Sequence, residues 1–289
     1  MKKITQLLFL LILASQSQAQ YKSLLWKISG NGIKDPAYLY GTMHTGDSRV
    51  IALSEKARPY FNNAKAYAME LDPAESMDMG LLSRLMMGKD YSLRKMLPAM
   101  EYAFLDSIVT KQIGFSMALF DNVAPVFVMT IFESMSLGLS DSSLNGNTQV
   151  LDLYFYDQAK KAKKKIIGIE TADEQLDALG TLGYKEQADL LVEEMKASEN
   201  NAQDGKDVLR YYLNQDLDSL SATDNDAKMP DKFYKALVTD RNKRMADRIA
   251  KFIKDQPTFI AIGALHLPGQ QGVIELLRKK GFTVEAVNK

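Results

Sequence analysis

Short apolar runs, each bordered by turn-forming or polar residues, constrain the fold of this 289-residue chain most strongly. Runs of this kind are typical of β-strands that are buried in a sheet. The Gly30-Asn31-Gly32 turn signal after the first run predicts a hairpin into the second. Six segments fit the description, and the last is expected at the edge of the sheet: 24–30, 37–41, 65–71, 164–170, 258–265 and 281–287.

Helical patterns lie between these runs. One pattern covers 54–64 with Ser54 as its N-cap, one covers 147–165, and one covers 271–280 and ends at Gly281. A longer helix is expected from about Asp231 to Phe252. Because strands and helices alternate at both ends of the chain, we predict an α/β fold with a mixed, largely parallel central sheet and flanking helices.

The middle of the chain differs from its two ends. Residues 76–145 are rich in methionine and follow a helical pattern, clearest over 97–113 and 123–139. A methionine-lined groove for an apolar ligand is one interpretation, and ordinary helix packing is the favoured one because methionine is a common core filler. We therefore predict a helical insertion at about 76–145 within a single domain that spans 20–289.

The N-terminus has the pattern of a secretory signal peptide. Lys2 and Lys3 give a basic start, residues 7–13 are apolar but too few to span a bilayer, and Ser17-Gln18-Ala19 forms a small-x-small cleavage site. A retained membrane anchor is the alternative. We expect cleavage before Gln20 and an exported protein, periplasmic or secreted. No later segment reaches 18 apolar residues, so no stable membrane insertion is expected after cleavage.

Composition restricts the chemistry. The chain has no cysteine, so any metal must take nitrogen and oxygen ligands, and cysteine cannot be a covalent nucleophile. Without Lys2 and Lys3, 34 basic residues stand against 36 acidic ones, a formal charge of −2. This balance gives no reason to expect a nucleic-acid partner.

The only two histidines share their surroundings. His44 and His266 each follow an apolar run, and each stands three residues after a glycine, Gly41 or Gly263. A lone histidine is more often a core or surface residue, but the repeated context favours a functional pair. Ligands of α/β proteins bind at the carboxyl ends of the strands, where both histidines are expected. A glycine at this place allows a sharp turn or a close approach of another chain segment.

Two glutamates end the other inner runs. Glu70 closes 65–71, and Glu170 closes 164–170. Two imidazoles with one or two carboxylates are typical of a site for a divalent metal ion. The structural alternative for each glutamate is a helix cap or a salt bridge. Asp72, directly before Pro73, is interpreted as a turn former.

One arginine interrupts an apolar helix face. The gap in that face falls on Arg241, which predicts a side chain directed at the core. It either pairs with a core carboxylate and fixes packing, or orients a site glutamate or a substrate carboxylate. The apolar face consists of Phe233, Leu237, Met245, Ile249 and Phe252.

Several segments, in this order, resemble the TraB/GumN family, which is similar to the Tiki metalloproteases: LWKISGNG, AYLYGTMHTG, MELD, KKIIGIET, DRNKRMADRI and IAIGALHLPGQQGVIELLRKKGFTVEAV. The resemblance implies a metal-dependent hydrolytic centre with two Gly-x-x-His motifs and a glutamate. It marks Gly41, His44, Glu70, Glu170, Gly263 and His266. Arg241 and Asn242 match an Arg-Asn pair of the family, with Met245 in place of a frequent tryptophan. The wider clan includes erythromycin-esterase-like and haem-binding ChaN-like proteins.

We therefore expect an exported, divalent-metal-dependent hydrolase that acts as a protease or peptidase on peptide or protein substrates. His44 and His266, with Glu70 or Glu170, would hold Mn, Co or Zn, and the remaining glutamate would be the general base. Arg241 would orient a carboxylate, and Asn242 would contact substrate. The alternatives are a metal-free, esterase-like hydrolase with a histidine base, and a non-enzymatic protein that binds haem or a metal ion.

Overall fold

A mixed six-stranded sheet forms the centre of the fold. The computed structural model describes residues 21–74, 83–134, 150–200, 202–226 and 229–287, so the expected signal peptide lies outside the described residues. The strand order is β4-β3-β5-β2-β1-β6. The strands are β1 (Leu25–Ser29), β2 (Ala37–Thr42), β3 (Ala66–Met69), β4 (Lys165–Gly168), β5 (Thr258–Gly263) and β6 (Thr283–Ala286). All six predicted strands are present, within a few residues of their predicted ends.

The pairing directions confirm the predicted fold class. Strands β4, β3, β5 and β2 are parallel neighbours, whereas β1 is antiparallel to both β2 and β6. The β1–β2 hairpin turns at Gly30, Asn31 and Gly32, which all have positive φ angles (80°, 45° and 81°). Only glycine, and less readily asparagine, adopts this backbone region at low cost, which explains the turn signal in the sequence.

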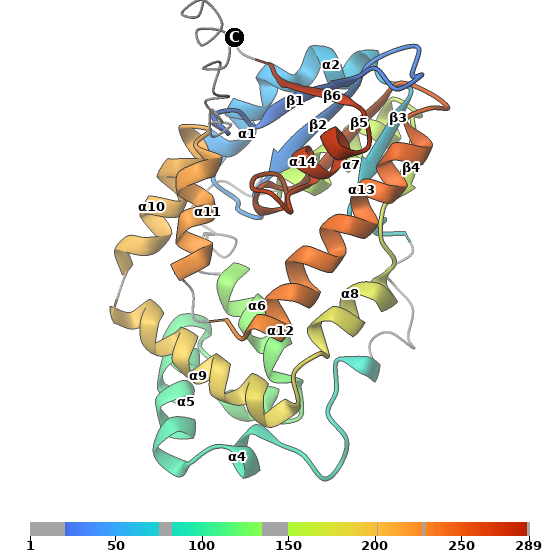
Figure 1. The fold of residues 1–289 in the computed structure, drawn as a ribbon. Helices are drawn as coiled ribbons and strands as arrows, with labels where there is room; N and C mark the ends of the chain where they lie inside the picture. The colour runs from blue at the N-terminus through green and yellow to red at the C-terminus, as the bar shows by residue number, and fades with distance from the viewer. Residues whose placement is uncertain (1–20, 75–82, 135–149, 201, 227–228, 288–289) are drawn as a thin grey trace, which may run out of the picture.

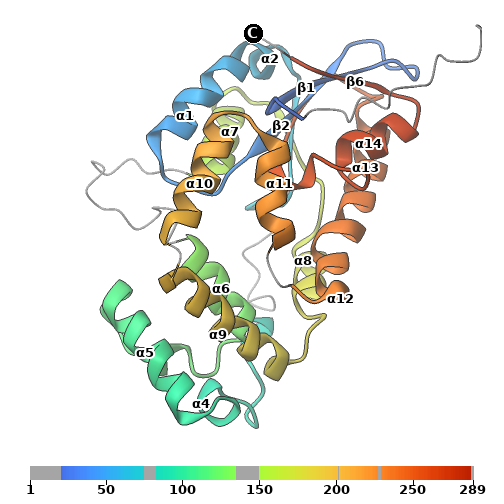
Figure 2. The same ribbon diagram turned by 60° about the vertical axis from the view of Figure 1, so that its left-hand side comes forward.

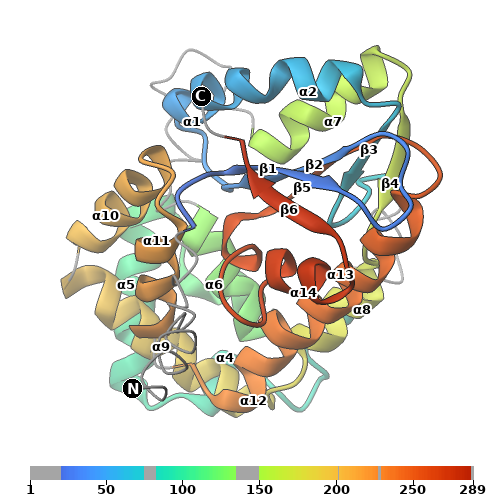
Figure 3. The same ribbon diagram turned by 45° about the horizontal axis from the view of Figure 1, so that its top comes forward.

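Helices cover both faces of the sheet (Figure 3). One face carries α1 (Ser48–Ser54), a 3₁₀ turn (Glu55–Ala57), α2 (Arg58–Asn63) and α7 (Leu151–Lys161), and the other carries α13 (Asp240–Phe252) and α14 (Val273–Lys279). The rings of Phe61, Phe155 and Phe259 contact one another between the first helical layer and the sheet, with centroids 5.1–5.5 Å apart. This aromatic contact fixes α7 against the sheet.

The helix after the first histidine begins earlier than predicted. Its N-cap is Asp47, whose side chain accepts a hydrogen bond from the backbone N–H of Arg49. Ser54 instead ends α1, and its hydroxyl donates to the carbonyl of Ile51. Ser54 therefore does not cap a helix with its side chain as predicted: it precedes the 3₁₀ turn without a capping hydrogen bond, and Asp47, seven residues earlier, caps the first turn of α1.

A second hydrophobic cluster lies away from the sheet, in the lower part of Figures 1 and 2. It joins α4 (Leu93–Met96), α5 (Ala99–Ile113), a 3₁₀ turn (Met117–Phe120), α6 (Pro125–Ser134) and α9 (Tyr184–Asn200). Four methionines of this cluster are buried: Met87, Met117, Met129 and Met195. The first three lie within 76–145 and support the packing interpretation there, whereas Met86 and Met100 of the same segment are exposed. Residues 75–82 and 135–149, which include the expected limits of the insertion, lie outside the described residues.

The long helix predicted for 231–252 connects the two clusters (Figure 1). It starts as α12 (Asp231–Tyr234), passes through a π-helical stretch at Lys235–Thr239, and continues as α13. Phe233 packs in the second cluster, whereas Met245 and Ile249 pack under the sheet. A π-helical turn accommodates an extra residue, so it changes the direction of the side chains that follow it. The first of these is Asp240, next to Arg241.

The remaining helices are α8 (Ala172–Leu179), α10 (Ala202–Leu213) and α11 (Leu217–Asp226). Within the described ranges, no helix combines the length and the apolar character needed to cross a membrane.

Candidate active site

The two Gly-x-x-His motifs lie side by side at one edge of the sheet. Strands β2 and β5 are parallel neighbours, with Thr42 opposite Gly263 in the register. Each strand therefore delivers its histidine to the same edge. Strand β3 lies on the other side of β5, and Glu70 directly follows its last residue.

Glu170 joins the same edge through a short extension of the β3–β4 ladder. The backbone N–H of Ile169 donates to the carbonyl of Met69, and the N–H of Glu170 donates to the carbonyl of Glu70, each at 2.8 Å. The two glutamates are thus neighbours, 100 residues apart in sequence. The sheet topology alone brings together His44, Glu70, Glu170 and His266.

The shared glycines let the two motifs approach each other. A Cβ atom on Gly41 would lie 3.1 Å from Cα of Ala264 and 3.2 Å from Cδ2 of Leu267. A Cβ atom on Gly263 would lie 3.2 Å from Oε1 of Glu70. Both contacts are tighter than most Cβ atoms make, so a larger residue at either position would require its neighbour to shift by a few tenths of an ångström. The two glycines therefore favour the close approach of the two motifs and of Glu70.

His266 is buried and held in one orientation. Its Nδ1 lies 2.6 Å from Oδ1 of Asn242, while the Asn242 amide nitrogen donates to the carbonyl of Gln271. Because Oδ1 of Asn242 can only accept, the Nδ1 atom of His266 carries the proton. Nε2 then has a free lone pair, and it lies 3.9 Å from Oε1 of Glu70. Burial lowers the pKa of His266, which favours this neutral form.

His44 has a different environment, since 61% of its side chain is exposed. Its Nε2 lies 3.3 Å from Oδ2 of Asp152, a residue of α7. The contact with the Asp152 carboxylate raises the pKa of His44 to about 9, which outweighs the opposing effect of desolvation. The two histidines of the repeated motif are therefore not equivalent.

Asp152 is a site residue that the sequence did not reveal. It is buried, and its Oδ1 accepts a hydrogen bond from the Thr42 hydroxyl at 2.9 Å. One sequence signal could have identified it, because it shares a helical stripe with the buried Phe155 and Ala159. An acidic residue on an apolar stripe is as unusual as Arg241 is on α13.

Arg241 links the two glutamates, as its place in the apolar stripe predicts. Its Nη2 donates to Oε2 of Glu70 and to Oε2 of Glu170, both at 2.7 Å, and its Nε donates to Glu170 at 2.9 Å. Only 13% of the Arg241 side chain is exposed, and none of the Glu170 side chain. Glu170 also contacts Arg244 and Gln175. Both oxygens of Glu170 are therefore engaged by the protein.

Glu70 is held ionised. Burial by itself would raise its pKa, but His266 when protonated, the Arg241 guanidinium, protonated His44 and a hydrogen bond from the N–H of Gly263 lower it to about 2. The Gly263 N–H lies 2.7 Å from Oε1, the oxygen that faces His266. At neutral pH, Glu70 is thus a negatively charged hydrogen-bond acceptor, not a proton donor.

Asn242 lies at the site, as predicted, but its side chain contacts groups of the protein itself. The side chain is buried, and its oxygen and nitrogen contact His266 and Gln271. These contacts favour a role in orienting His266 over direct contact with substrate.

The donor atoms fit a divalent ion in chemistry but are not assembled around one point. In the described part of the chain, no three His, Asp or Glu side chains form a ready-made metal site. However, His266 shows the usual pattern of a metal-binding histidine, in which one ring nitrogen is fixed by a hydrogen bond and the other is free. His44–Asp152 and His266–Glu70 are two imidazole–carboxylate pairs, and such nitrogen and oxygen donors suit Mn, Co or Zn.

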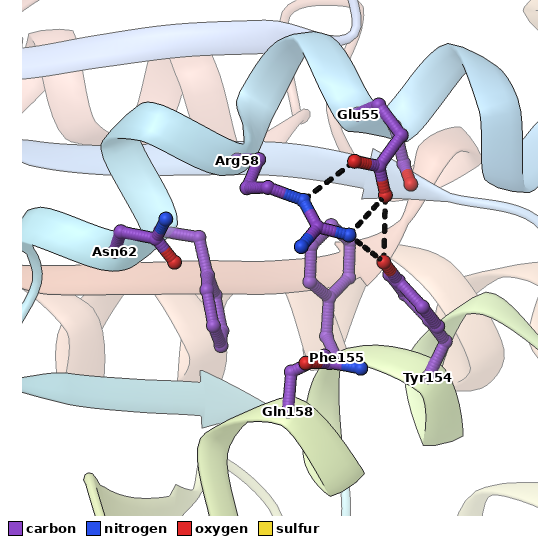
Figure 4. A pocket seen from close by; sticks show the side chains of 8 residues that line it. Glu55, Arg58, Asn62, Tyr154, Phe155 and Gln158 are labelled. Atoms are coloured by element: carbon purple, nitrogen blue, oxygen red, sulfur yellow. Dashed lines mark hydrogen bonds and ion pairs between the residues drawn. The ribbon is translucent and has the colours of Figure 1, made fainter. Parts of the chain in front are cut away.

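A separate small pocket lies between α2 and α7 (Figure 4). Its polar groups bind one another: Arg58 contacts the Glu55 carboxylate and the Tyr154 hydroxyl, which also donates to Glu55. These three side chains therefore satisfy one another, while the side chains of Asn62 and Gln158 also line the pocket.

The ionised state of Glu70 predicts acid sensitivity of the metal-free protein. Its pKa is about 2 in the folded chain, against an ordinary value of 4.5. A lowered folded-state pKa stabilises the fold above pH 4.5, and this stabilisation is lost as the pH falls towards 2. The loss amounts to at most about 3 kcal/mol. Denaturant unfolding at several acidic pH values measures it, and Glu70→Gln should flatten the dependence. Equal slopes for both proteins would contradict this assignment.

Comparisons with known proteins identify the family of the chain. The chain is 27% identical to "Metalloprotease TIKI1" of Danio rerio, 26% to "Metalloprotease TIKI2" of Xenopus tropicalis and 24% to "Metalloprotease TIKI1" of Homo sapiens. Each comparison covers 93% of this chain but only 64%, 61% and 62% of the respective relative, so the chain spans less than two thirds of their length. No solved structure matches the chain. The model of the TraB/PrgY/gumN family matches residues 24–286, almost all of the described chain, and the protein therefore belongs to this family.

Proposed function

We propose that the protein is an exported, divalent-metal-dependent peptidase whose ion is held by His44, His266 and Glu70. The observation that carries the proposal is the state of His266: Asn242 fixes its Nδ1, and its free Nε2 faces the ionised Glu70. Relatives that carry the name metalloprotease support the same reaction class. A bound ion would polarise the scissile carbonyl and lower the pKa of a water molecule.

The protein's own residues prepare this site before any ion arrives. Asn242 selects the tautomer of His266 and fixes the direction of its ring. Arg241 compensates the negative charges of Glu70 and Glu170, which would otherwise repel each other at the sheet edge. The N–H of Gly263 fixes the Glu70 oxygen that faces His266. Each of these contacts limits the movement of a donor atom, which favours ion binding.

The two glutamates have different roles in this proposal. Glu70 faces the histidines and serves as a ligand. Glu170 is enclosed by Arg241, Arg244 and Gln175 and has no exposed side-chain surface, so it positions Arg241. This geometry fits an anchoring residue better than a general base, because a base must reach the water from which it takes a proton.

A second candidate function rests on the His44–Asp152 pair. An exposed imidazole with a buried carboxylate behind it is the arrangement of a histidine base that an acid orients. With Nε2 directed at Asp152, Nδ1 of His44 is the nitrogen available to a reactant once the ring has lost a proton, and because the pKa of His44 is about 9, this base forms only at alkaline pH. This geometry would serve a metal-free, esterase-like hydrolysis.

Chelation separates the two candidates. Activity on unstructured peptides should disappear in a chelator and return with added Mn, Co or Zn, because the proposed reaction depends on an ion. The measurement is peptide cleavage followed by mass spectrometry, with total metal determined in the same samples. Full activity of metal-free protein would contradict the metal proposal and favour the His44–Asp152 base. Inactivity under all conditions, with a haem-like absorption band, would favour a binding protein instead.

A further inference from the structure

We infer that Asp152 is a positioning residue of this site, whose carboxylate holds the first Gly-x-x-His motif in place. The inference deepens the proposed function where it concerns ion binding, but its main claim concerns the His44 ring and does not require an ion.

The backbone of Asp152 is fixed by the core. It lies in the first turn of α7, between Leu151, which is fully buried, and the core residue Phe155. The ring of Phe155 packs against Phe61 and Phe259 between the helices and the sheet. The Asp152 side chain is 12% exposed, so its carboxylate has little freedom to move.

The carboxylate contacts the motif at two points. Oδ1 accepts a hydrogen bond from Thr42 at 2.9 Å, and Oδ2 lies 3.3 Å from Nε2 of His44. Thr42 and His44 are the second and fourth residues of the motif that starts at Gly41. The side chain of Asp152 therefore contacts both the end of β2 and His44.

Oδ2 of Asp152 requires a polar partner close to it. It is buried and makes no well-formed hydrogen bond within the described residues, so His44 is the group that compensates it. A buried carboxylate oxygen without a partner is costly, which ties the exposed imidazole to this position.

The comparison with His266 shows why the contact between Asp152 and His44 is needed to orient the His44 ring. His266 is buried and held by Asn242. His44 is mostly exposed, and among the described contacts its ring is held by Asp152. An exposed imidazole without this contact would sample several rotamers, and an ion or reactant would have to order it at an entropic cost.

Ring mobility in metal-free protein tests the inference directly. The chain has only two histidines, so ring-¹³C-labelled, tag-free protein shows two imidazoles, which a His44→Gln variant assigns. Asp152→Ala should increase the fast motion of the His44 ring measured by ¹³C relaxation and leave His266 unchanged. Asp157→Asn, on the same helix, is the control and should change neither ring. Asp152→Asn, which keeps the shape of the side chain, serves if the alanine variant unfolds. Unchanged His44 mobility in the folded variant would overturn the inference.

Titration of Mn²⁺ into the same proteins tests the consequence for the proposed site. Loss of a residue that positions a ligand typically costs about 10- to 100-fold in affinity, which is the change expected for Asp152→Asn. Equal affinity in wild type and variant contradicts the positioning role. A wild-type protein that binds no ion rejects the proposed function instead, and the ring-mobility result still decides on Asp152.

Discussion

Replacing Arg241 by methionine is expected to lower the free energy of unfolding by about 3–5 kcal/mol. The substitution keeps an apolar side chain on the inner face of α13 but removes the guanidinium. Glu70 and Glu170 would then lie next to each other without the cation that contacts both at 2.7 Å. Glu170 has no exposed side-chain surface, so water cannot replace the lost hydrogen bonds. Denaturant unfolding at neutral pH measures the effect.

Arg244 supplies a matched control for this experiment. It lies one helical turn after Arg241 and contacts the same Glu170, but at 3.5 Å, and 35% of its side chain is exposed. Because partly exposed ion pairs contribute little, Arg244→Met should cost no more than about 1 kcal/mol. Similar losses for the two variants, or none for Arg241→Met, would show that Arg241 is not the residue that stabilises the two glutamates.

The second large effect is expected at His266. His266→Ala should remove most of the bound divalent ion and reduce peptide hydrolysis to background. The variant loses the fixed Nε2 atom that faces Glu70. The chain has only one other histidine, His44, which the proposed site already uses. Metal content per protein molecule and peptide cleavage are measured on the same preparation. His44→Ala should give the same result, because the proposed ion needs donors from both motifs.

Stability must be followed in parallel, since His266→Ala also leaves Oδ1 of Asn242 without its partner. Leu265→Ala is the control, because it truncates the neighbouring side chain, which is exposed and is not one of the proposed ligands. Wild-type metal content in both folded histidine variants would mean that the histidines are not ligands. A loss of activity with unchanged metal would point to the His44–Asp152 base.

Local patterns of the chain allowed the sheet to be predicted from sequence. Each strand is a short apolar run with its own turn or polar borders, and these signals act within a few residues. Two local features could not be predicted in this way: the helix N-cap at Asp47 and the π-helical stretch at Lys235–Thr239. Both depend on which of several competing hydrogen-bond patterns the packed chain selects, and sequence periodicity does not distinguish among them.

The sequence by itself determined which chemical groups this protein can use. It contains two histidines in a repeated context, two glutamates at strand ends, one arginine on an apolar helix face, and no thiol. Only the tertiary structure decided which of these groups contact each other. Asp152 meets Thr42 across 110 residues because α7 packs on one face of the sheet, and Asn242 faces His266 because α13 packs on the opposite face. Long-range contacts of this kind arise from the packing of whole elements. Local sequence therefore shows the donors, whereas the packed fold decides that one histidine is buried and fixed while the other is exposed and depends on a single aspartate.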